Sequence, residues 1–419
     1  MTHSTVDVRS KRVWKGLLKK IVNKKKLARA QAAQEHTAED AIDIQLFKAD
    51  TIDSMVWPEN EEGQFAQRCL APIIKEGTNH FFDNIDVEFC VLRVGEHVFP
   101  LVISNDNYEN SYVCSPYGHY ISLALESLFI IKKALLKHTA RLFLTRFGRI
   151  LKKRKINKIV YVNHWLLSTD LYPSELSFEH VAAMTSFLKR HFPQHAIAFR
   201  SINSKTNAEL KRNLENLNFQ FIASRQIYMT DTSNQDLYAT RIIKSDLKLW
   251  KESDYEIIES ESMDDQDKER ILSLYQKLAI ENHSQHNPRL NLRFIQLMLD
   301  QKILQVKALK KNGSIDGVVG YTERNQILTC PFFGYDKTQQ ENPRLYRLLS
   351  TLLLLESGKK AKTFHQSAGA SFYKTIRRAV GYTEYLSVYS AHLPRKQRYA
   401  WWLLEKTMNL AALPLMKKY

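Results

Sequence analysis

The spacing of apolar residues between positions 255 and 390 predicts short strands and amphipathic helices in a regular order. Strands are expected where apolar residues alternate or cluster between turn residues, and helices where they recur every three or four positions. The expected segments are a strand at 255–260, helices at 264–284 and 291–301, three strands within 303–336, a helix at 342–361, and a strand, a helix and a strand at 362–369, 370–380 and 382–390. The order is therefore β-α-α-β-β-β-α-β-α-β.

The first half of the chain shows a weaker version of the same pattern. Residues 87–106 predict a hairpin, and 111–116 a third strand. A long helix is expected over 121–155, with a break near Gly148. Strand, helix, strand and helix follow, and 220–231 is either a strand pair or one bent strand. The fold class expected from both halves is α/β, with two domains that each combine a mixed, mostly antiparallel sheet with flanking helices.

The expected domain organisation follows from these patterns. Its parts are a basic amphipathic segment at 1–41, a first α/β domain at 42–236, a connector at 237–254, a second α/β domain at 255–391 and an amphipathic helix at 392–419. In the first segment, Trp14, Leu18 and Ile21 share one helical face, and lysines surround them. This segment is either an interfacial helix on anionic lipid or a solvated basic tail.

The C-terminal helix also allows two interpretations. An apolar stripe runs along it, formed by Trp401, Leu404, Met408, Ala411 and Leu415. Basic residues flank the stripe, which suits a membrane interface. Alternatively, the helix docks on the first domain, and Trp401 and Trp402 belong to the core of that domain.

The net charge of this chain is unusual, whereas its hydrophobic content is ordinary. It has 419 residues, 44% of them hydrophobic, which is enough for two or three domains. A balance of 61 Lys and Arg against 44 Asp and Glu gives a net charge of +17, which attracts polyanions such as nucleic acid, anionic lipid or phosphate-bearing cofactors. No signal peptide or apolar run of membrane-spanning length is visible. We therefore expect a cytoplasmic protein, either soluble or peripheral on the inner face of the membrane.

The cysteines give no sign of a disulfide framework or a metal site. Cys69, Cys90, Cys114 and Cys330 do not form CxxC pairs, and no histidine cluster has metal-ligand spacing. We expect reduced, mostly buried thiols and no metal.

A family resemblance rests on this element order and on "QSAGASFYKTIRRAVGY", residues 366–382. The order in the second half resembles the GNAT acyltransferase fold, whose last helix typically carries NxxAxxLYxxxGF. Tyr373 stands in the Tyr position, Gly369 stands where Ala is usual, and Gly381-Tyr382 comes one helical turn late. Two such domains in one chain resemble the FemAB-like branch, which attaches acyl or aminoacyl groups to amines.

One departure separates the chain from ordinary GNAT enzymes. Those usually place Q/R-x-x-G-x-G/A after the fourth strand, where backbone N–H groups bind the pyrophosphate of CoA. The corresponding segment here is "GYDKTQQENPRLYR", residues 334–347, which has no glycine after Gly334. FemAB-like proteins also lack that loop. The departure therefore favours the FemAB-like branch over an ordinary acetyl-CoA enzyme.

Acyl transfer to an amine needs a base, donors for the oxyanion and an acid for the leaving group. His365 lies near the C-terminal end of a strand, at the sheet edge that faces ligands, where a histidine can titrate near neutral pH. The resemblance implies that Tyr373 protonates a departing thiolate. Glu384 is a candidate base or a partner that orients His365. The structural alternatives are a hydrogen-bonded core histidine and an exposed strand glutamate.

The candidate binding residues surround these three. Ser367, Ala368, Gly369 and Ala370 either expose N–H groups to an anion or allow close helix–sheet packing. Lys374 and Arg378 lie one turn apart and suit a phosphate, unless they form a solvated face.

Further candidates come from other segments. Tyr335 and Asp336 follow the fourth strand, as hydrogen-bond donor and base or as turn residues. A polar cluster within 282–287 is either an acceptor site or a loop. Arg225 and Tyr228 are placed at a cleft between the domains by position alone.

The leading interpretation is an acyltransferase. It would move an acyl or aminoacyl group from acyl-CoA, acyl carrier protein or aminoacyl-tRNA to a small-molecule or lipid-linked amine, without a metal. The rival interpretation is a nucleic-acid- or membrane-binding protein on a catalytically inactive GNAT scaffold. The net charge and the basic helix at 137–155 favour it, although no RRM, KH, helix-turn-helix or zinc-finger signature is visible. An anionic membrane surface and tRNA are the expected macromolecular partners.

Overall fold

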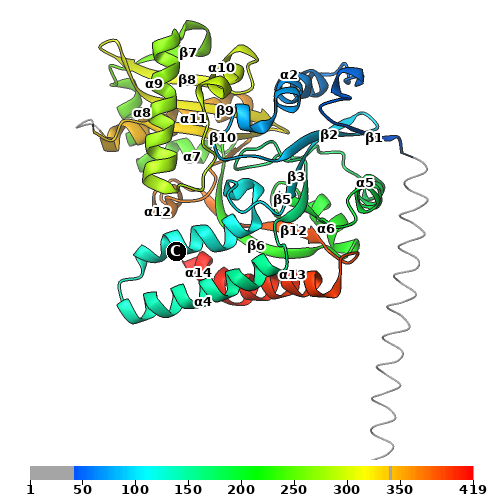
Figure 1. Cartoon of the computed structure of the whole chain (residues 1–419). Coiled ribbons are helices and arrows are strands. Elements are labelled where there is room, and N and C mark those ends of the chain that lie inside the picture. Colours follow the sequence, from blue (N-terminus) through cyan, green and yellow to red (C-terminus); the bar gives the residue numbers. More distant parts are fainter. Residues whose placement is uncertain (1–41, 339–341, 419) are drawn as a thin grey trace, which may run out of the picture.

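The computed structural model describes residues 42–338 and 342–418. These residues form one twelve-stranded sheet with helices on both faces (Figure 1). The strands of the first half are β1 (Ile44–Phe47), β2 (Glu88–Val94), β3 (His97–Asn105), β4 (Lys158–Val162), β5 (Ala196–Ile202) and β6 (Gln220–Asp231). Those of the second half are β7 (Glu256–Glu259), β8 (Gln305–Lys311), β9 (Ser314–Arg324), β10 (Ile327–Tyr335), β11 (Thr363–His365) and β12 (Val380–Tyr389). The expected mixed α/β class is confirmed.

The two halves exchange their last strands. The order across the sheet is β1-β2-β3-β4-β5-β12-β6-β11-β10-β9-β8-β7. Strand β12 pairs with β5 of the first half, and β6 pairs with β11 of the second half. The two exchanged strands pair with each other in antiparallel register, from Val380–Met229 to Val388–Gln220. Each half therefore completes its sheet with a strand of the other, and neither is a separable unit in this fold.

The remaining elements are α-helices and short 3-10 or π turns. The α-helices are α2 (Glu61–Glu76), α3 (Leu123–Glu126), α4 (Ala134–Lys153), α5 (Phe178–His191), α6 (Ala208–Asn216), α7 (Gln235–Ala239), α8 (Arg241–Lys251), α9 (Asp265–Tyr275), α10 (Leu292–Asp300), α11 (Asn342–Lys360), α12 (Ser371–Thr375), α13 (Arg395–Thr407) and α14 (Leu413–Lys418). Short 3-10 or π turns are η1 (Ile52–Ser54), η2 (Thr78–His80), η3 (Tyr112–Cys114), η4 (Gly118–Ser122), η5 (Ser127–Ile130), η6 (Ser260–Ser262), η7 (Gln276–His283) and η8 (Met408–Ala412). The second half thus has the β-α-α-β-β-β-α-β-α-β order expected from its sequence.

Local sequence signals explain where the main helices begin. The side chain of Ser177 accepts a hydrogen bond from the backbone N–H of His180 at the start of α5. Asp264 caps α9 in the same way, through the N–H of Asp267 at 2.8 Å. Such caps contribute about 1 kcal/mol each, because they satisfy N–H groups that have no partner within the helix.

Alternating residues of the strands fill cores on the two faces of the sheet. One hydrophobic cluster spans both halves beneath α2, α4, α9, α10 and α13. On the opposite face, α5 and α6 cover a cluster of the first half, and α11 covers one of the second half. The leucines that recur at helical spacing along α11 are buried, namely Leu345, Leu348, Leu349 and Leu352.

The structure differs from the prediction at a strand and a helix of the first half, and it decides between the two alternatives for residues 220–231. Residues 112–114 form η3 rather than a third strand, and 220–231 is one continuous strand. The long helix is interrupted at 131–133 instead of near Gly148. Gly148 lies inside α4, where an added Cβ would meet Ile121 and Tyr117 at 3.0 Å. This glycine allows close packing within a helix, so it does not end the helix.

The C-terminal helix docks on the sheet. The side chain of Trp401 is 2% exposed in the first core, whereas Trp402 is 44% exposed. Asn409 binds β6 from η8, donating to the carbonyl of Phe221 at 2.7 Å and accepting from the N–H of Ala223 at 2.9 Å. The docking interpretation is right for Trp401 and Leu404, while Ala411 and Leu415 at the other end of the stripe are exposed. The amphipathic segment expected at 1–41 lies outside the described residues.

Gly334 allows α9 to lie against β10. A Cβ at this position would come within 2.7 Å of the backbone nitrogen of Tyr275 and 2.8 Å of the carbonyl carbon of Leu274. Backbone atoms cannot move aside as a flexible side chain can. We expect Gly334→Ala to lower the free energy of unfolding by about 1–3 kcal/mol, the usual effect of overpacking. Equilibrium urea unfolding measures this, and an unchanged midpoint would contradict the close approach.

Candidate active site

Two neighbouring parallel strands separate in the second half and leave a cavity between them. Strands β10 and β11 pair from Ile327–Thr363 to Thr329–His365 and then diverge. The pairing of β10 with β9 is irregular between Thr329 and Phe332, a stretch that contains Pro331. Proline has no N–H to donate to a neighbouring strand, which favours separation here. The resulting space, which we call the main cavity, has a volume of about 460 Å³.

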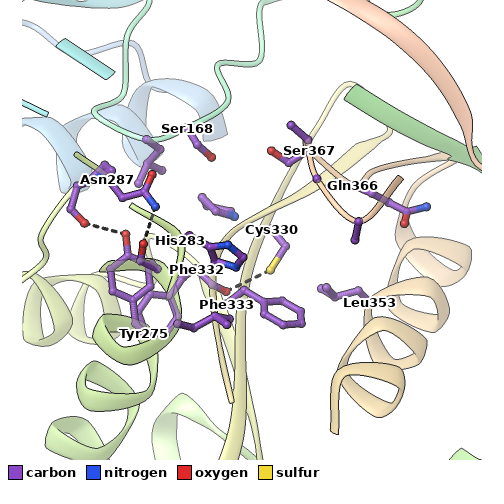
Figure 2. A pocket seen from close by; sticks show the side chains of 18 of the residues that line it. Ser168, Tyr275, His283, Asn287, Cys330, Phe332, Phe333, Leu353, Gln366 and Ser367 are labelled. Carbon is purple, nitrogen blue, oxygen red and sulfur yellow. Dashed lines mark hydrogen bonds between the residues drawn. The ribbon is translucent and has the colours of Figure 1, made fainter. Parts of the chain in front are cut away.

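The walls of the main cavity are largely aromatic. Figure 2 shows Tyr275 and Asn287 on one side, Ser367 and Leu353 on the other, and Phe333 between them. Tyr275 stacks on Phe332 with 5.1 Å between ring centroids, and its hydroxyl donates to the carbonyl of Pro288 at 2.8 Å. These contacts fix the ring of Tyr275 as a rigid wall. The lining therefore suits an elongated, partly apolar ligand with a few polar contacts.

Lys374 places a buried amine at the wall of the main cavity. Its Nζ donates to the carbonyls of Gln366 at 2.7 Å, Ala368 at 2.8 Å and Ser367 at 3.4 Å. Burial, together with the nearby cation of Arg225, lowers the pKa of Lys374 to about 7. A lysine with this pKa can both accept and donate a proton near neutral pH.

The small residues after β11 form the cage of this amine. Three residues of this loop have a positive φ: Ser367 (+58°), Gly369 (+77°) and Ala370 (+48°). Residues with a small side chain or none adopt this backbone conformation most easily. The loop thereby turns three carbonyls toward Lys374. Among the described residues, the N–H groups of Ala368, Gly369 and Ala370 have no protein partner, and all three residues line the main cavity. These amides are available to a carbonyl oxygen or an anion.

His365 lines the main cavity but lacks the near-neutral pKa expected of it. The side chain is buried, and its Nδ1 accepts a hydrogen bond from the N–H of Ser367 at 3.2 Å. Burial, followed by the charge of Arg225, lowers the pKa of His365 to about 3. The imidazole is therefore neutral at physiological pH, and the hydrogen bond assigns its proton to Nε2. It fits a hydrogen-bond donor better than a base.

Arg225 connects the two halves of the molecule beside the cavity. On the exchanged strands it faces Glu384, and its Nε donates to Oε1 of that carboxylate at 2.7 Å. Its Nη2 donates to the carbonyl of Ser168 at 2.7 Å and to Oγ1 of Thr169 at 3.2 Å, and Nη1 lies 3.4 Å from Oγ of Ser367. A side chain that the sequence placed at a cleft by position alone is thus the link between a first-half loop and the cage of Lys374.

The other predicted site residues are distributed around the cavity. Tyr335 lines it, and burial raises the pKa of its phenol. Asp336 is not among the lining residues; although burial opposes this, hydrogen bonds from Thr338 and Arg270 lower its pKa to about 2. Arg270 also binds it at 2.7 Å, so Asp336 is a fixed anion rather than a base.

Tyr373 and Glu384 lie outside the main cavity. The ring of Tyr373 contacts Tyr346, a lining residue, with 4.7 Å between centroids. Its hydroxyl is buried, and this burial raises the pKa of the phenol. Glu384 borders a separate space of about 20 Å³. The structure therefore does not bring the three predicted catalytic side chains together.

The helix face expected to join Lys374 and Arg378 does not form. Helix α12 ends at Thr375, and Arg378 has a φ of +66°. Lys374 consequently points into the protein, whereas Arg378 is exposed. From the polar cluster expected at 282–287, His283 and Asn287 line the main cavity.

In the first half, buried side chains fill the place where the equivalent pair of parallel strands separates. Strands β4 and β5 are also parallel and diverge after Val162 and Phe199. A buried cluster occupies the divergence: Nδ1 of His164 lies 3.1 Å from Oδ1 of Asp170, and Nη1 of Arg200 lies 3.1 Å from Oδ2 of the same carboxylate. The space beside Arg200 in this cluster has a volume of about 20 Å³, whereas the divergence in the second half borders the main cavity.

A second large cavity adjoins the main one. It has a volume of about 620 Å³, and Leu167, Phe294 and Leu304 line both spaces. We call it the acidic cavity, because its lining contains the carboxylates of Glu61, Glu62, Glu96 and Glu323 against the cations of Arg68 and Arg324. The three shared side chains are the apolar boundary that the two cavities have in common. Leu167 belongs to the same first-half loop that Arg225 holds.

The cysteines and metal-binding groups complete the description of the site. All four cysteines are free; Cys69, Cys90 and Cys114 are buried, and Cys330 lines the main cavity. Burial raises the pKa of the Cys330 thiol to about 12, so it is not a thiolate at neutral pH. In residues 42–338 and 342–418, no group of three or more His, Cys, Asp or Glu side chains could hold a metal ion.

Sequence reasoning missed the main feature of the site. Lys374 was predicted as a phosphate-binding side chain on an exposed helix face, and the structure makes it a buried amine. Only the unusual run of small residues before it signals a loop that can enclose a side chain. Ser168 and Leu167, which reach the cavity from the first half, have no sequence signal.

Comparison with known proteins gives structural similarity alone. No family model and no curated protein matches the chain. A solved structure of FemX has 8% sequence identity over 53% of this chain and 79% of its own, with a TM-score of 0.42. The structure of L-PGS from Bacillus licheniformis has 11% identity over 51% and 73%, with a TM-score of 0.40. A tandem GNAT protein from the clavulanic acid biosynthesis pathway has 9% identity over 84% and 99%, with a TM-score of 0.37.

These likenesses are too distant to transfer a site or a substrate. The chain's own element order and the divergence of β10 and β11 agree with the fold that the sequence resembles. What the structure shows is a mixed α/β fold in which two halves share one sheet and exchange their last strands.

Proposed function

We propose that the protein transfers an acyl or aminoacyl group from an activated carrier to an amine, and that the main cavity is the site of transfer. The observation that carries the proposal is Lys374, a buried amine with a pKa near 7 at the wall of a substrate-sized cavity. Such groups are concentrated at active sites, because burying a charge without a functional use is costly. Here three backbone carbonyls offset part of that cost, and the remaining desolvation keeps the pKa of Lys374 low.

The chemistry assigns a step to each group. The amine nitrogen of the acceptor attacks the carbonyl carbon of a thioester or ester donor, and neutral Lys374 takes the proton that the nitrogen releases. The N–H groups of Ala368 and Gly369 stabilise the oxyanion of the tetrahedral intermediate. When the bond to the thiolate or alkoxide breaks, the proton returns from Lys374 to that leaving group. His365 contributes a neutral hydrogen-bond donor at Nε2.

The two cavities suggest separate routes for the two substrates. The aromatic main cavity suits the acyl donor, either acyl-CoA, acyl carrier protein or aminoacyl-tRNA. The acidic cavity suits a positively charged amine, which its carboxylates would attract. The amine would reach the donor past Leu167, Phe294 and Leu304. A small-molecule amine and a lipid-linked amine both fit this arrangement.

A bulkier side chain in the shared wall tests this route. We expect Leu167→Trp to reduce kcat/KM for the amine by about tenfold or more. A single methylene group added to or removed from an apolar pocket already changes kcat/KM by about tenfold. Binding of the donor, measured by calorimetry, should fall less than this, because Leu167 is only one of many residues that line the main cavity. Equal losses for donor and amine would contradict separate routes.

The proposed activity is tested by supplying each class of donor. The full chain is incubated with radiolabelled acyl-CoA, acylated carrier protein or aminoacyl-tRNA, together with a mixture of amines from a cell extract. We expect one donor class to lose its label to an amine. If no donor class does so, the chain is a binding protein on an inactive GNAT scaffold, and the proposal is wrong.

A further inference from the structure

One segment of the first half carries a large positive charge that nothing in it compensates. Residues 127–155 contain ten Lys and Arg residues and no Asp or Glu. Eight of these ten cations belong to a helical hairpin of η4, α3, η5 and α4, residues 118–153, in which α4 packs back on the other three elements. We call this the basic hairpin. None of its Lys or Arg residues lines the main cavity or the acidic cavity.

The basic hairpin also exposes large apolar side chains. At its tip, Phe129 is 74% and Ile130 68% exposed. On α4, the exposed residues Leu136, Phe143 and Ile150 recur every seven positions and therefore share a face. Leu135 and Leu142 widen this exposed stripe, while Phe147 and Leu151 on another side of the helix are buried in the core. The exposed side chains are thus not needed to hold α4 on the protein.

A second exposed apolar segment lies near the basic hairpin. His119 of η4 is 3.0 Å from the hydroxyl of Ser224 on β6, and Asn409 of η8 binds the neighbouring Phe221 and Ala223. The hairpin and the C-terminal helix are therefore anchored on the same stretch of β6, and Figure 1 shows α4 and α13 at the same end of the molecule. Leu410 and Leu415 of the C-terminal helix are exposed.

We propose that the basic hairpin, with the adjoining exposed face of residues 408–416, binds the surface of an anionic phospholipid bilayer. Exposed apolar side chains would enter the boundary between headgroups and acyl chains, and the lysines and arginines would lie among anionic headgroups. Among the described residues, no helix has the length and apolar composition to cross a bilayer, so the contact is interfacial. This surface is independent of the proposed transfer reaction.

Other occupants would match either the charge or the apolar side chains of this surface poorly. Nucleic acid would be attracted by the cations but would leave Phe129, Ile130 and the α4 stripe in contact with water. A second copy of the chain would bring a surface of the same charge. Residues 1–41 carry ten Lys and Arg against four Asp and Glu, so they too would be repelled. An anionic lipid surface matches both the charge and the apolar side chains.

Cosedimentation of the full chain with vesicles tests the proposal. We expect the protein to bind vesicles of phosphatidylglycerol and not vesicles of phosphatidylcholine, with binding that weakens as salt rises. A tip variant, Phe129→Ser with Ile130→Ser, and a stripe variant, Leu136→Ser with Phe143→Ser, should each lower the partition coefficient about tenfold or more. The matched control is Val56→Ser, which removes an apolar side chain that is 74% exposed elsewhere.

Other outcomes would overturn the assignment. Unchanged binding by both variants would place the lipid contact elsewhere, for example in residues 1–41. Tip and stripe variants that lose binding to RNA, without any binding of the parent protein to vesicles, would make nucleic acid the ligand. A dimer that dissociates in the stripe variant, detected by analytical ultracentrifugation, would make a second copy the occupant. Because no substrate is used, these results do not depend on whether the transfer reaction occurs.

Discussion

Replacement of Lys374 by Met is expected to reduce turnover by about 10²–10⁴-fold, the usual contribution of a general acid–base group. The substitution keeps a chain of similar length in the cage and removes the amine that exchanges the proton. The measurement is single-turnover transfer of label from donor to amine at a pH near 7. Donor binding should change little, because the aromatic walls that would hold the donor remain.

The matched control for this variant is Lys362→Met. Lys362 is exposed, just before β11, and it lies outside both cavities. Its substitution should leave turnover at the level of the unmodified protein. If Lys374→Met also retains that level, the amine is a structural group that only stabilises the loop from Gln366 to Ala370.

Replacement of Arg225 by Met is expected to lower the free energy of unfolding by about 3–5 kcal/mol. The change leaves Glu384 buried without its ion-pair partner, which is the costly way to break such a pair. The carbonyl of Ser168 loses its donor as well, so the loop that carries Leu167 should become mobile. Equilibrium unfolding in urea measures the loss of stability.

A double variant separates the ion pair from the rest of the effect. Arg225→Met combined with Glu384→Met replaces both charges by apolar groups and should recover much of the stability lost in Arg225→Met alone. Additive losses in the two single variants and the double variant would show that the two side chains do not act as a pair.

The sequence predicted the order of elements better than it predicted the site. Helical and strand periodicities depend on burial of one face, and residues such as Leu345 and Leu348 carry that signal within a few neighbours. The exchange of β6 and β12 carries no such signal, because each strand has the same pattern of alternation whichever sheet it completes. Arg225 and Glu384 lie 159 positions apart in the sequence and meet only through that exchange.

The chemistry of the site depended on burial, which sequence patterns do not report for single polar residues. His365 was correctly placed at the end of a strand, but its pKa is set by desolvation and by Arg225, which comes from another half of the chain. Lys374 looked like a surface residue because its helix was expected to continue past Arg378. Its solvation by backbone carbonyls depends on the positive φ angles of Ser367 and Ala370, for which neither residue type is a marker.

The pH dependence of kcat/KM for transfer tests the central claim most directly. Because Lys374 acts as a base in its neutral form, the account predicts that kcat/KM rises as pH increases through about 7 and then levels off. Arg225 contributes to lowering this pKa, so Arg225→Met should move the rise to higher pH in protein that remains folded. The rise should be absent in Lys374→Met. A profile in Lys374→Met with the same midpoint as in the unmodified protein would contradict the account.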